Sequence, residues 1–263
     1  LKKHQFTFIS GVNTLFNKLL LEDDFKNCNF SKLRISLAGG MQVQKSVAER
    51  WQEVTGNVLS VGYGLSETSP AASIDPIGVD KFSDTLGLPL PSTEISIQDD
   101  QGNHLDFNEP GEICIRGPQV MKGYWNNVEE TNNVMTSDGW FKTGDIGIMN
   151  EGGFPKIVDR KKDMIIVSGF NVYPNEIEEV AMLHEKVFEA GCIGIKDQEG
   201  SENIKLFISK VPHSNLTSQE IIDHCKKYLT GYKIPEFVKF IDEIPKSNVG
   251  KILRRKLREL KNE

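Results

Sequence analysis

Hydrophobic and polar positions follow two periods in the first 80 residues. Short apolar runs predict strands, and apolar residues spaced for one helical face predict helices between them. The strands are expected at residues 6–9, 33–38 and 58–63, and the helices at 13–21 and 44–55. Strand and helix in alternation are typical of a parallel α/β sheet. Two of these strands run into glycine, which favours ligand loops at the carboxyl edge of the sheet.

The sequence pattern changes near residue 74, where glycine and proline begin to recur every few positions. Short alternating runs at 94–97 and 112–115 lie between these turn residues. This pattern predicts a small antiparallel barrel or meander rather than helices.

The last hundred residues mix strand and helix patterns again. Strands are expected at 164–167, 187–195, 204–211 and 237–241, and helices at 174–182, 218–229 and 251–261. We therefore predict α/β and α+β architecture in three parts. These are the carboxyl-terminal part of a large α/β subdomain (1–78), a β-barrel subdomain (79–158) and a compact α+β domain (159–263).

Charge and cysteine content exclude several classes of protein. The 263 residues carry 31 basic and 37 acidic side chains, a net charge of −6, which argues against a nucleic-acid-binding protein. The four cysteines form no C-x-x-C pair, so we expect no zinc ribbon. We expect the cysteines to be reduced thiols in the cytosol. No apolar run approaches the roughly 20 residues that cross a bilayer, and we expect no signal peptide.

The segment 63–68 has the residue types of a nucleotide loop after a strand. Tyr63 offers an aromatic face for a purine, and Gly64 permits close approach of the backbone. Ser66 can hydrogen-bond a phosphate, and Glu67 is a hard oxygen ligand for magnesium. An ordinary turn with an exposed acid is the alternative.

Two further segments carry candidate polar chemistry. In 139–145, Asp145 beside glycine can accept both hydroxyls of a ribose, the alternative being a β-turn with an Asx bond. The charged run 159–163 is either solvated or a hinge between domains.

A loop at 245–251 presents Lys251 at the start of the last predicted helix. A lysine is mildly unfavourable there because the helix dipole has its positive end nearby, and such a local conflict points to function. The basic residues that follow predict a solvated face, with a membrane or acidic-partner surface as the alternative. They are Arg254, Arg255, Lys256, Arg258 and Lys261.

Other catalytic signatures are missing from the sequence. It contains no H-E-x-x-H, no G-x-S-x-G and no G-x-x-x-x-G-K-[ST]. These absences disfavour a metalloprotease, an α/β-hydrolase and a P-loop NTPase.

In this order, the segments 63–68, 139–145, 159–178 and 245–255 resemble the adenylate-forming superfamily. Acyl-CoA synthetases, peptide-synthetase adenylation domains and luciferases belong to it. The sequences of segments 117–121, 229–233 and 245–255 resemble those of bacterial long-chain fatty-acid–CoA ligases in particular.

Members of the superfamily are about twice as long, and their phosphate loop ending in Pro-Lys-Gly is absent here. The resemblance therefore implies the carboxyl-terminal half of such an enzyme, ending in its mobile cap domain. Two positions depart from the family pattern. Ser66 replaces the usual threonine, and the segment 38–42 has fewer glycines and lacks a proline.

The resemblance implies a two-step ligase that uses ATP, Mg²⁺ and CoA. A fatty acid attacks the α-phosphate of ATP to give acyl-AMP and pyrophosphate, and the CoA thiol then displaces AMP. Tyr63 and the Gly39-Gly40 segment are implied to hold the adenine, and Ser66 the α-phosphate. Gly64 is implied to be nucleotide-binding as part of the same loop.

Four charged side chains complete the implied adenylation site. Glu67 binds magnesium, Asp145 and Arg160 hold the ribose, and Lys251 bridges the carboxylate and the α-phosphate. The implied catalytic residues are thus Lys251, Ser66 and Glu67.

The family also implies a rotation of the cap domain between the two steps. Lys162 matches the pivot. The second conformation withdraws Lys251 and brings Ser168 and Gly169 to the pantetheine channel of CoA, where a side chain at Gly169 would obstruct the ligand. A plain turn glycine is the alternative there.

The expected partners are small molecules, namely fatty acid, ATP and CoA, and no nucleic acid. A cytoplasmic location, peripheral contact at the inner face of the cell membrane and a homodimer are further expectations. Two alternatives stay open: a related adenylating enzyme that loads a carrier protein, or, for this chain alone, a binding module without catalysis.

Overall fold

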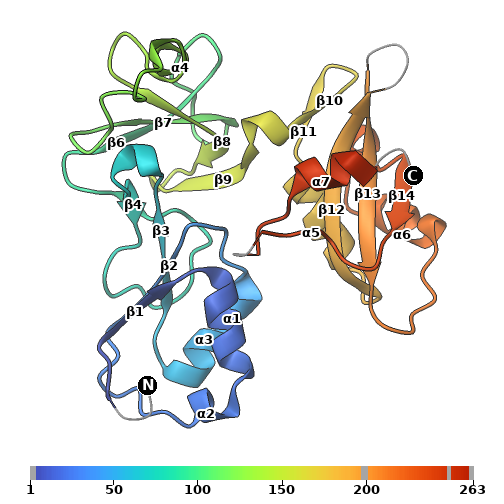
Figure 1. The fold of residues 1–263 in the computed structure, drawn as a ribbon, viewed down its shortest axis with the longest axis horizontal. Coiled ribbons are helices and arrows are strands. Elements are labelled where there is room, and N and C mark those ends of the chain that lie inside the picture. Colours follow the sequence, from blue (N-terminus) through green and yellow to red (C-terminus); the bar gives the residue numbers. More distant parts are fainter. Residues whose placement is uncertain (1–3, 197–200, 248–249, 261–263) are drawn as a thin grey trace. The chain divides into compact units, whose positions relative to one another are not determined.

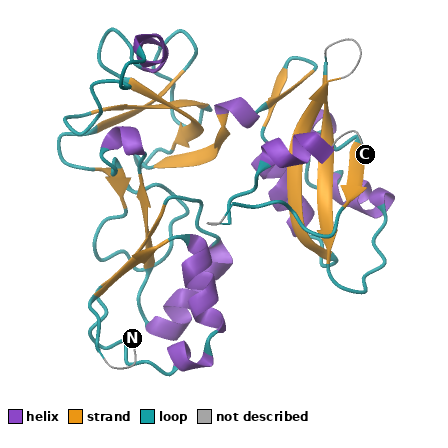
Figure 2. Ribbon diagram, viewed as in Figure 1, coloured by secondary structure: helices purple, strands orange, loops and turns teal. Residues whose placement is uncertain are grey.

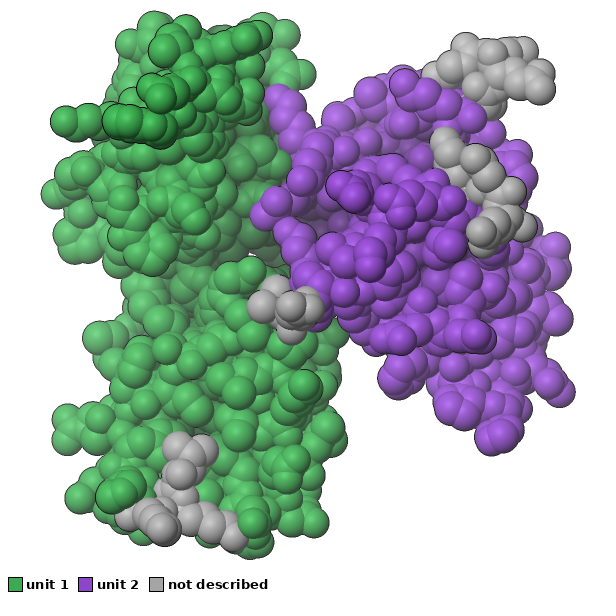
Figure 3. All heavy atoms as spheres, viewed as in Figure 1, with its two compact units in different colours: residues 1–157 green, residues 158–263 purple. Residues whose placement is uncertain are grey.

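The computed structural model describes residues 4–196, 201–247 and 250–260. The chain separates into two compact units, residues 1–157 and 158–263 (Figure 3). The three-part division expected from the sequence stays a prediction.

The first sheet of unit 1 has the order β1-β2-β3-β4-β5. Its strands are β1 (Phe8–Gly11), β2 (Ile35–Gly39), β3 (Leu59–Tyr63), β4 (Ser73–Ile74) and β5 (Leu88–Pro89). The first three strands pair in parallel, and β4 and β5 join as antiparallel strands. The parallel α/β core is thus confirmed, with an antiparallel edge that the sequence pattern did not reveal.

Helices α1 (Asn13–Leu21) and α3 (Lys45–Thr55) pack side by side against this sheet (Figures 1 and 2). Both carry buried aromatic or aliphatic residues on one face, including Phe16 and Trp51, whose rings meet edge to face at 4.8 Å. The short helix α2 (Asp23–Lys26) adds Phe25 to the same core.

A second sheet has the order β6-β7-β8-β9 and belongs to unit 1 up to residue 157, within β9. Its strands are β6 (Glu94–Gln98), β7 (Gly111–Arg116), β8 (Phe141–Met149) and β9 (Pro155–Arg160), and α4 (Val128–Val134) precedes β8. Among the described residues this sheet is an open meander, so the closed barrel is not observed. Four strands are fewer than the roughly five to eight that small barrels use to close.

Unit 2 is built on the sheet β12-β13-β14. The strands are β12 (Val187–Lys196), β13 (Glu202–Lys210) and β14 (Phe237–Phe240), with the hairpin β10 (Ile165–Val167) and β11 (Phe170–Val172) beside them. Its helices are α5 (Pro174–Met182), α6 (Ser218–Cys225) and α7 (Arg254–Glu259). Short 3-10 turns lie at Ser66–Thr68, Lys161–Asp163 and Gly231–Lys233.

Successive residues of β13 point to opposite faces of the sheet, because side chains alternate along a strand. Leu206 lies in the core with α5 and α6, whereas Phe207 packs with Leu257 of α7 in a separate cluster. This arrangement confirms the predicted α+β domain and places α7 on its own face. None of the described helices combines the length and apolar character that crossing a membrane requires.

The predicted helices lie where the sequence pattern places them, but the ends of two helices differ from the prediction by several residues. The predicted bounds of α1 are correct, but α6 ends at Cys225 and α7 begins only at Arg254. Lys251 therefore lies before the last helix and not at its start. The apolar spacing of 226–229 continues the helical pattern, although the backbone there forms turns.

The capping box at the start of α6 gives a test of the fold. The backbone N–H of Thr217 donates to Glu220 Oε2 at 2.8 Å, and Thr217 Oγ1 accepts from the Glu220 N–H at 3.3 Å. Hydrogen bonds from the Thr217 backbone and side chain, and then from Lys186, lower the pKa of Glu220 from 4.5 to about 2. The stability that this shift contributes is present above pH 4.5 and is lost as the pH falls toward about 2.

We expect Thr217→Ala to destabilise α6 by about 1 kcal/mol, because both hydrogen bonds between the Thr217 hydroxyl and Glu220 are lost. The pKa of Glu220 should rise toward its ordinary value in the same variant. Amide exchange across α6 and a carboxylate titration by NMR measure both effects. Thr230→Ala is the matched control, because Thr230 precedes a 3-10 turn without a side-chain cap bond. Equal effects of the two substitutions would contradict this prediction.

Candidate functional site

The two glycine-containing segments predicted for the nucleotide lie at the carboxyl ends of neighbouring parallel strands. Gly39 ends β2 and pairs with Gly62 of β3, whereas Gly40 has a φ of +75°. A Cβ on Gly39 would lie 2.9 Å from the Gly62 carbonyl oxygen. Close strand approach and a left-handed backbone therefore account for these glycines within the fold. The carboxyl edge they form is where ligands bind in such sheets.

The loop after β3 is held by Thr68, a residue to which the sequence pattern assigns no role. Its hydroxyl lies 2.9 Å from the Leu65 nitrogen and donates to the Pro70 carbonyl oxygen at 2.8 Å. Thr68 is buried, whereas Ser66 is exposed and Glu67 is half-buried. The loop thus fixes its backbone through Thr68 and leaves the Ser66 hydroxyl at the surface.

Gly64 is required by the loop itself. A Cβ at this position would come within 1.8 Å of the Pro70 carbonyl oxygen and 2.8 Å of the Ala71 Cα. The close approach predicted at Gly64 is therefore made by residues 70–71 of the same chain.

Tyr63 and Asp145 are brought together from two different sheets of unit 1. The Tyr63 hydroxyl donates to Asp145 Oδ2 at 2.8 Å, although 82 positions separate the two residues. Asp145 lies inside β8 and is buried. It is therefore part of a strand and not of the β-turn considered as the alternative. The Tyr63 ring belongs to a hydrophobic cluster with Ile113 and Ile115. A fixed carboxylate thus stands beside the tyrosine at the end of β3.

Glu67 has a partner that the sequence did not reveal. The Tyr124 hydroxyl donates to Glu67 Oε1 at 2.9 Å, and the Met121 N–H donates to the Glu67 carbonyl at 2.8 Å. Burial, followed by the hydrogen bond to Glu67, raises the pKa of Tyr124 to about 12. Tyr124 therefore remains a donor at neutral pH and orients the Glu67 carboxylate.

This carboxylate fits the magnesium role in its donor chemistry. Mg²⁺ typically takes one or two carboxylates and completes its shell with water and substrate phosphates. Across the described residues, no group of three or more His, Cys, Asp or Glu side chains could form a cage for a metal by itself. A single oriented carboxylate is consistent with an ion that arrives with a nucleotide.

The charged run at the start of unit 2 is not simply solvated. Asp159 and Asp163 are buried, whereas Lys162 is exposed and Arg160 is half-buried. Asp159 accepts the Arg160 N–H at 2.7 Å and the Asn175 N–H at 2.8 Å. Burial raises the pKa of Asp159 despite the nearby Arg254.

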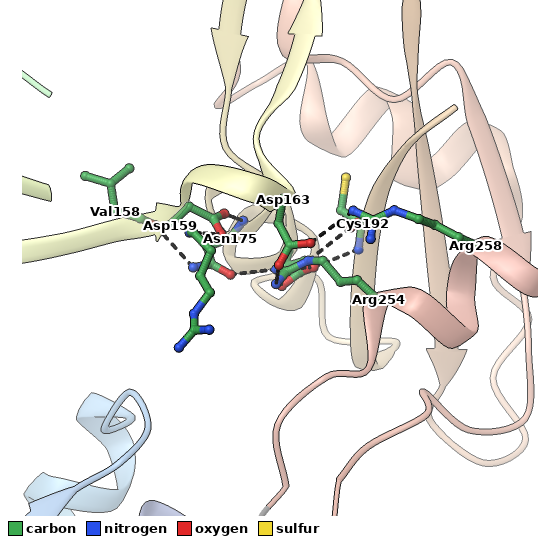
Figure 4. A network of polar contacts seen from close by, with 9 residues as sticks. Val158, Asp159, Asp163, Asn175, Cys192, Arg254 and Arg258 are labelled. Atoms are coloured by element: carbon green, nitrogen blue, oxygen red, sulfur yellow. Dashed lines mark hydrogen bonds and ion pairs between the residues drawn. The ribbon is translucent and has the colours of Figure 1, made fainter. Parts of the chain in front are cut away.

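Asp163 and a further buried acid, Glu178, lie against Arg254, whose exposed fraction is 8% (Figure 4). Its Nη2 donates to Asn175 Oδ1 at 2.7 Å and to Glu178 Oε1 at 2.8 Å. Burial raises the pKa of Glu178 to about 7, against the lowering effect of Arg254. The solvated basic face predicted for the last helix is therefore wrong at Arg254, because this side chain points into unit 2.

Ser168 and Gly169 form the two-residue turn between β10 and β11. Their φ angles are +50° and +84°, as in a type I′ hairpin turn, and a Cβ on Gly169 would meet no atom within 4 Å. The hairpin geometry alone favours glycine at this position. Both residues are exposed at the tip.

Lys251 is exposed on the turn that precedes α7. Its carbonyl accepts the Ser247 N–H at 2.8 Å, and its own N–H donates to Ser247 Oγ at 3.2 Å. The predicted loop 245–251 includes residues 248–249, which lie outside the described residues.

Residues 1–125 match the family model described as AMP-binding enzyme, and residues 176–251 match that of the AMP-binding enzyme C-terminal domain. The chain belongs to the adenylate-forming superfamily of AMP-binding enzymes. A long-chain-fatty-acid–CoA ligase of Yersinia pestis is 54% identical over 259 residues, 98% of this chain and 46% of the relative. A ligase of the same name from Bacillus subtilis is 39% identical over 262 residues, 99% of this chain and 47% of the relative.

Solved structures share the fold. ATP-bound MatB from Rhodopseudomonas palustris superimposes with a TM-score of 0.88 at 28% identity, over 97% of this chain and 50% of that one. The O-succinylbenzoate coenzyme A synthetase of Bacillus subtilis, in complex with AMP, superimposes with a TM-score of 0.82 at 33% identity. The match covers 97% of this chain and 51% of that one. The chain spans about half the length of the relatives it matches.

Gly64→Ala tests the loop geometry. We expect it to destabilise unit 1 by about 2–3 kcal/mol, because the added methyl group collides with backbone atoms. Urea denaturation monitored by the fluorescence of Trp51 and the other tryptophans measures the loss. Gly231→Ala is the control: a Cβ there meets no atom within 4 Å and the φ is not left-handed. A stability of Gly64→Ala within about 0.5 kcal/mol of the parent chain would refute the steric argument.

Proposed function

We propose that this chain serves fatty-acid activation, in which ATP, a long-chain fatty acid and CoA give acyl-CoA, AMP and diphosphate through an acyl-adenylate. The observation that carries the proposal is the 54% identity to a long-chain-fatty-acid–CoA ligase over 98% of the chain. The oriented Glu67 and the Tyr63–Asp145 pair support it, because both suit a nucleotide with bound magnesium.

In the adenylation step, the residues of unit 1 bind and orient the nucleotide. We assign the adenine to Tyr63 and the Gly39-Gly40 edge, and the α-phosphate to the exposed Ser66 hydroxyl. Asp145 takes the ribose hydroxyls.

Glu67 would hold Mg²⁺, which supplies neutralisation of phosphate charge when it is bound. The Tyr124 hydroxyl keeps one carboxylate oxygen of Glu67 in place, so that the carboxylate does not have to reorganise.

In the same step, Arg160 and Lys251 of unit 2 contribute positive charge. Carboxylate and phosphate are both anions, so they repel each other unless a cation stands between them. A lysine ammonium is a compact charge with three donors, which suits the oxygens of both reactants. We assign Lys251 to this bridge and Arg160 to the ribose.

In the thioester step, CoA attacks the acyl-adenylate. We assign the pantetheine chain to the Ser168-Gly169 turn and the pivot between the two steps to Lys162. Lys162 is exposed, so its rotation would not disturb the core of unit 2.

Lys251→Ala tests the assignment in the complete enzyme. We expect acyl-AMP formation to fall by about 10²–10³, the cost of removing one charge-stabilising donor from a transition state. The reaction of supplied acyl-AMP with CoA should keep its rate. Pyrophosphate release and thioester formation from synthetic oleoyl-AMP measure the two steps separately.

Lys256→Ala, an exposed lysine on α7, is the control and should leave both steps unchanged. An equal fall of both steps in Lys251→Ala would remove Lys251 from the bridging role. If the parent enzyme forms oleoyl-AMP but transfers it to a carrier protein and not to free CoA, the ligase assignment itself is wrong.

A further inference from the structure

The turn that carries Lys251 is fixed at both of its ends. The Leu253 N–H donates to the Pro245 carbonyl at 2.8 Å, which closes the base of the turn. Ile244 is fully buried on one side of this base, and Arg254 is buried on the other. The Lys251 backbone therefore follows the position of Arg254, three residues along the chain.

Arg254 is held by hydrogen bonds from three directions (Figure 4). Its Nη2 bonds both Glu178 oxygens, at 2.8 and 2.9 Å, and also Asn175 Oδ1. Its Nε donates to the Cys192 carbonyl at 3.2 Å, and Asp163 lies 3.8 Å from Nη1. These contacts tie the start of α7 to α5, β12 and the 3-10 turn after β9.

The same network reaches the segment that carries Arg160. Asp159 accepts the N–H groups of both Arg160 and Asn175, and Asn175 in turn accepts from Arg254. Two side chains, Asp159 and Asn175, thus connect Arg254 to the backbone of Arg160. The segments that carry Arg160 and Lys251, the two cations assigned to the nucleotide, are therefore connected by one hydrogen-bond network within unit 2.

We propose that Arg254 is a positioning residue of the adenylation step: its buried contacts set the place of Lys251 relative to Arg160. This inference rests on the proposed function. A planar guanidinium suits the role, because it directs several donors at fixed angles, which a lysine cannot reproduce. Displacement of a catalytic group by about 1 Å can cost about 10²-fold in rate.

A purely structural role for Arg254 makes a different prediction. Loss of the fold of unit 2 would slow adenylation and thioester formation together, since the resemblance assigns parts of both steps to this unit. An effect through Lys251 slows adenylation alone. The ratio of the two rates therefore separates the two roles, whatever the change in total stability.

The experiment compares Arg254→Lys with the neighbouring Arg255→Lys in the complete enzyme. The Arg255 side chain is 91% exposed and pairs only with Glu259 among the ion pairs of the described residues. We expect Arg254→Lys to lower acyl-AMP formation by about 10²-fold while thioester formation from supplied oleoyl-AMP stays within about twofold. Arg255→Lys should change neither rate.

The double variant Lys251→Ala with Arg254→Lys completes the cycle. If Arg254 acts through Lys251, the second substitution adds no further loss to adenylation. Additive losses, or equal losses in both steps for Arg254→Lys, overturn the inference. If Lys251→Ala alone leaves adenylation intact, the proposed function of Lys251 fails instead, so the two failures are distinguishable.

Asn175→Ala provides a second variant should Arg254→Lys not fold. It removes the link from Arg254 to the Asp159 segment without leaving a buried charge. We expect a selective fall of adenylation of about 10-fold, smaller than for Arg254 because the contacts to Glu178 remain. An unchanged ratio of the two steps in this folded variant contradicts the proposal.

Discussion

The buried ion-pair network around Arg254 is the constraint on which the architecture of unit 2 depends. Desolvation opposes burial of Glu178, Asp163 and Asp159, and Arg254 supplies the positive charge among them, with Arg258 reaching Asp163 from the surface. Removing one partner of such a pair typically costs about 3–5 kcal/mol, since a charge then stays buried without compensation. The network therefore fixes one arrangement of α5, β12 and α7 and excludes looser ones.

In unit 1 the arrangement of the site residues is fixed by close backbone approach and by two hydroxyl–carboxylate contacts. Gly64 allows residues 70–71 to pack against the end of β3, and Thr68 then closes the loop. Tyr63 and Tyr124 each donate to a carboxylate brought from a distant part of the chain. Both tyrosines thus orient acids that the proposed function assigns to the nucleotide and its magnesium ion.

Local patterns predicted the elements well and their long-range contacts poorly. The helical spacing of 13–21 and the β-spacing of 94–97 are visible in the sequence, since each depends on neighbouring residues. The Tyr124–Glu67 contact spans 57 positions and has no local pattern. Arg254 lies in a basic run that is otherwise typical of a solvated face, and the buried acids that hold it are distant in sequence. The resemblance selected Lys251 and Arg160 without indicating what holds them.

The central claim is that a lysine on an anchored turn neutralises two anions while they are joined. A structure of the complete enzyme with a stable acyl-AMP analogue tests this claim most directly. We expect Lys251 Nζ at hydrogen-bond distance, about 3 Å, from both the acyl oxygen and an α-phosphate oxygen, with the Arg254 contacts unchanged. A structure in the adenylation conformation with another cation in that place, and Lys251 in solvent, would contradict it.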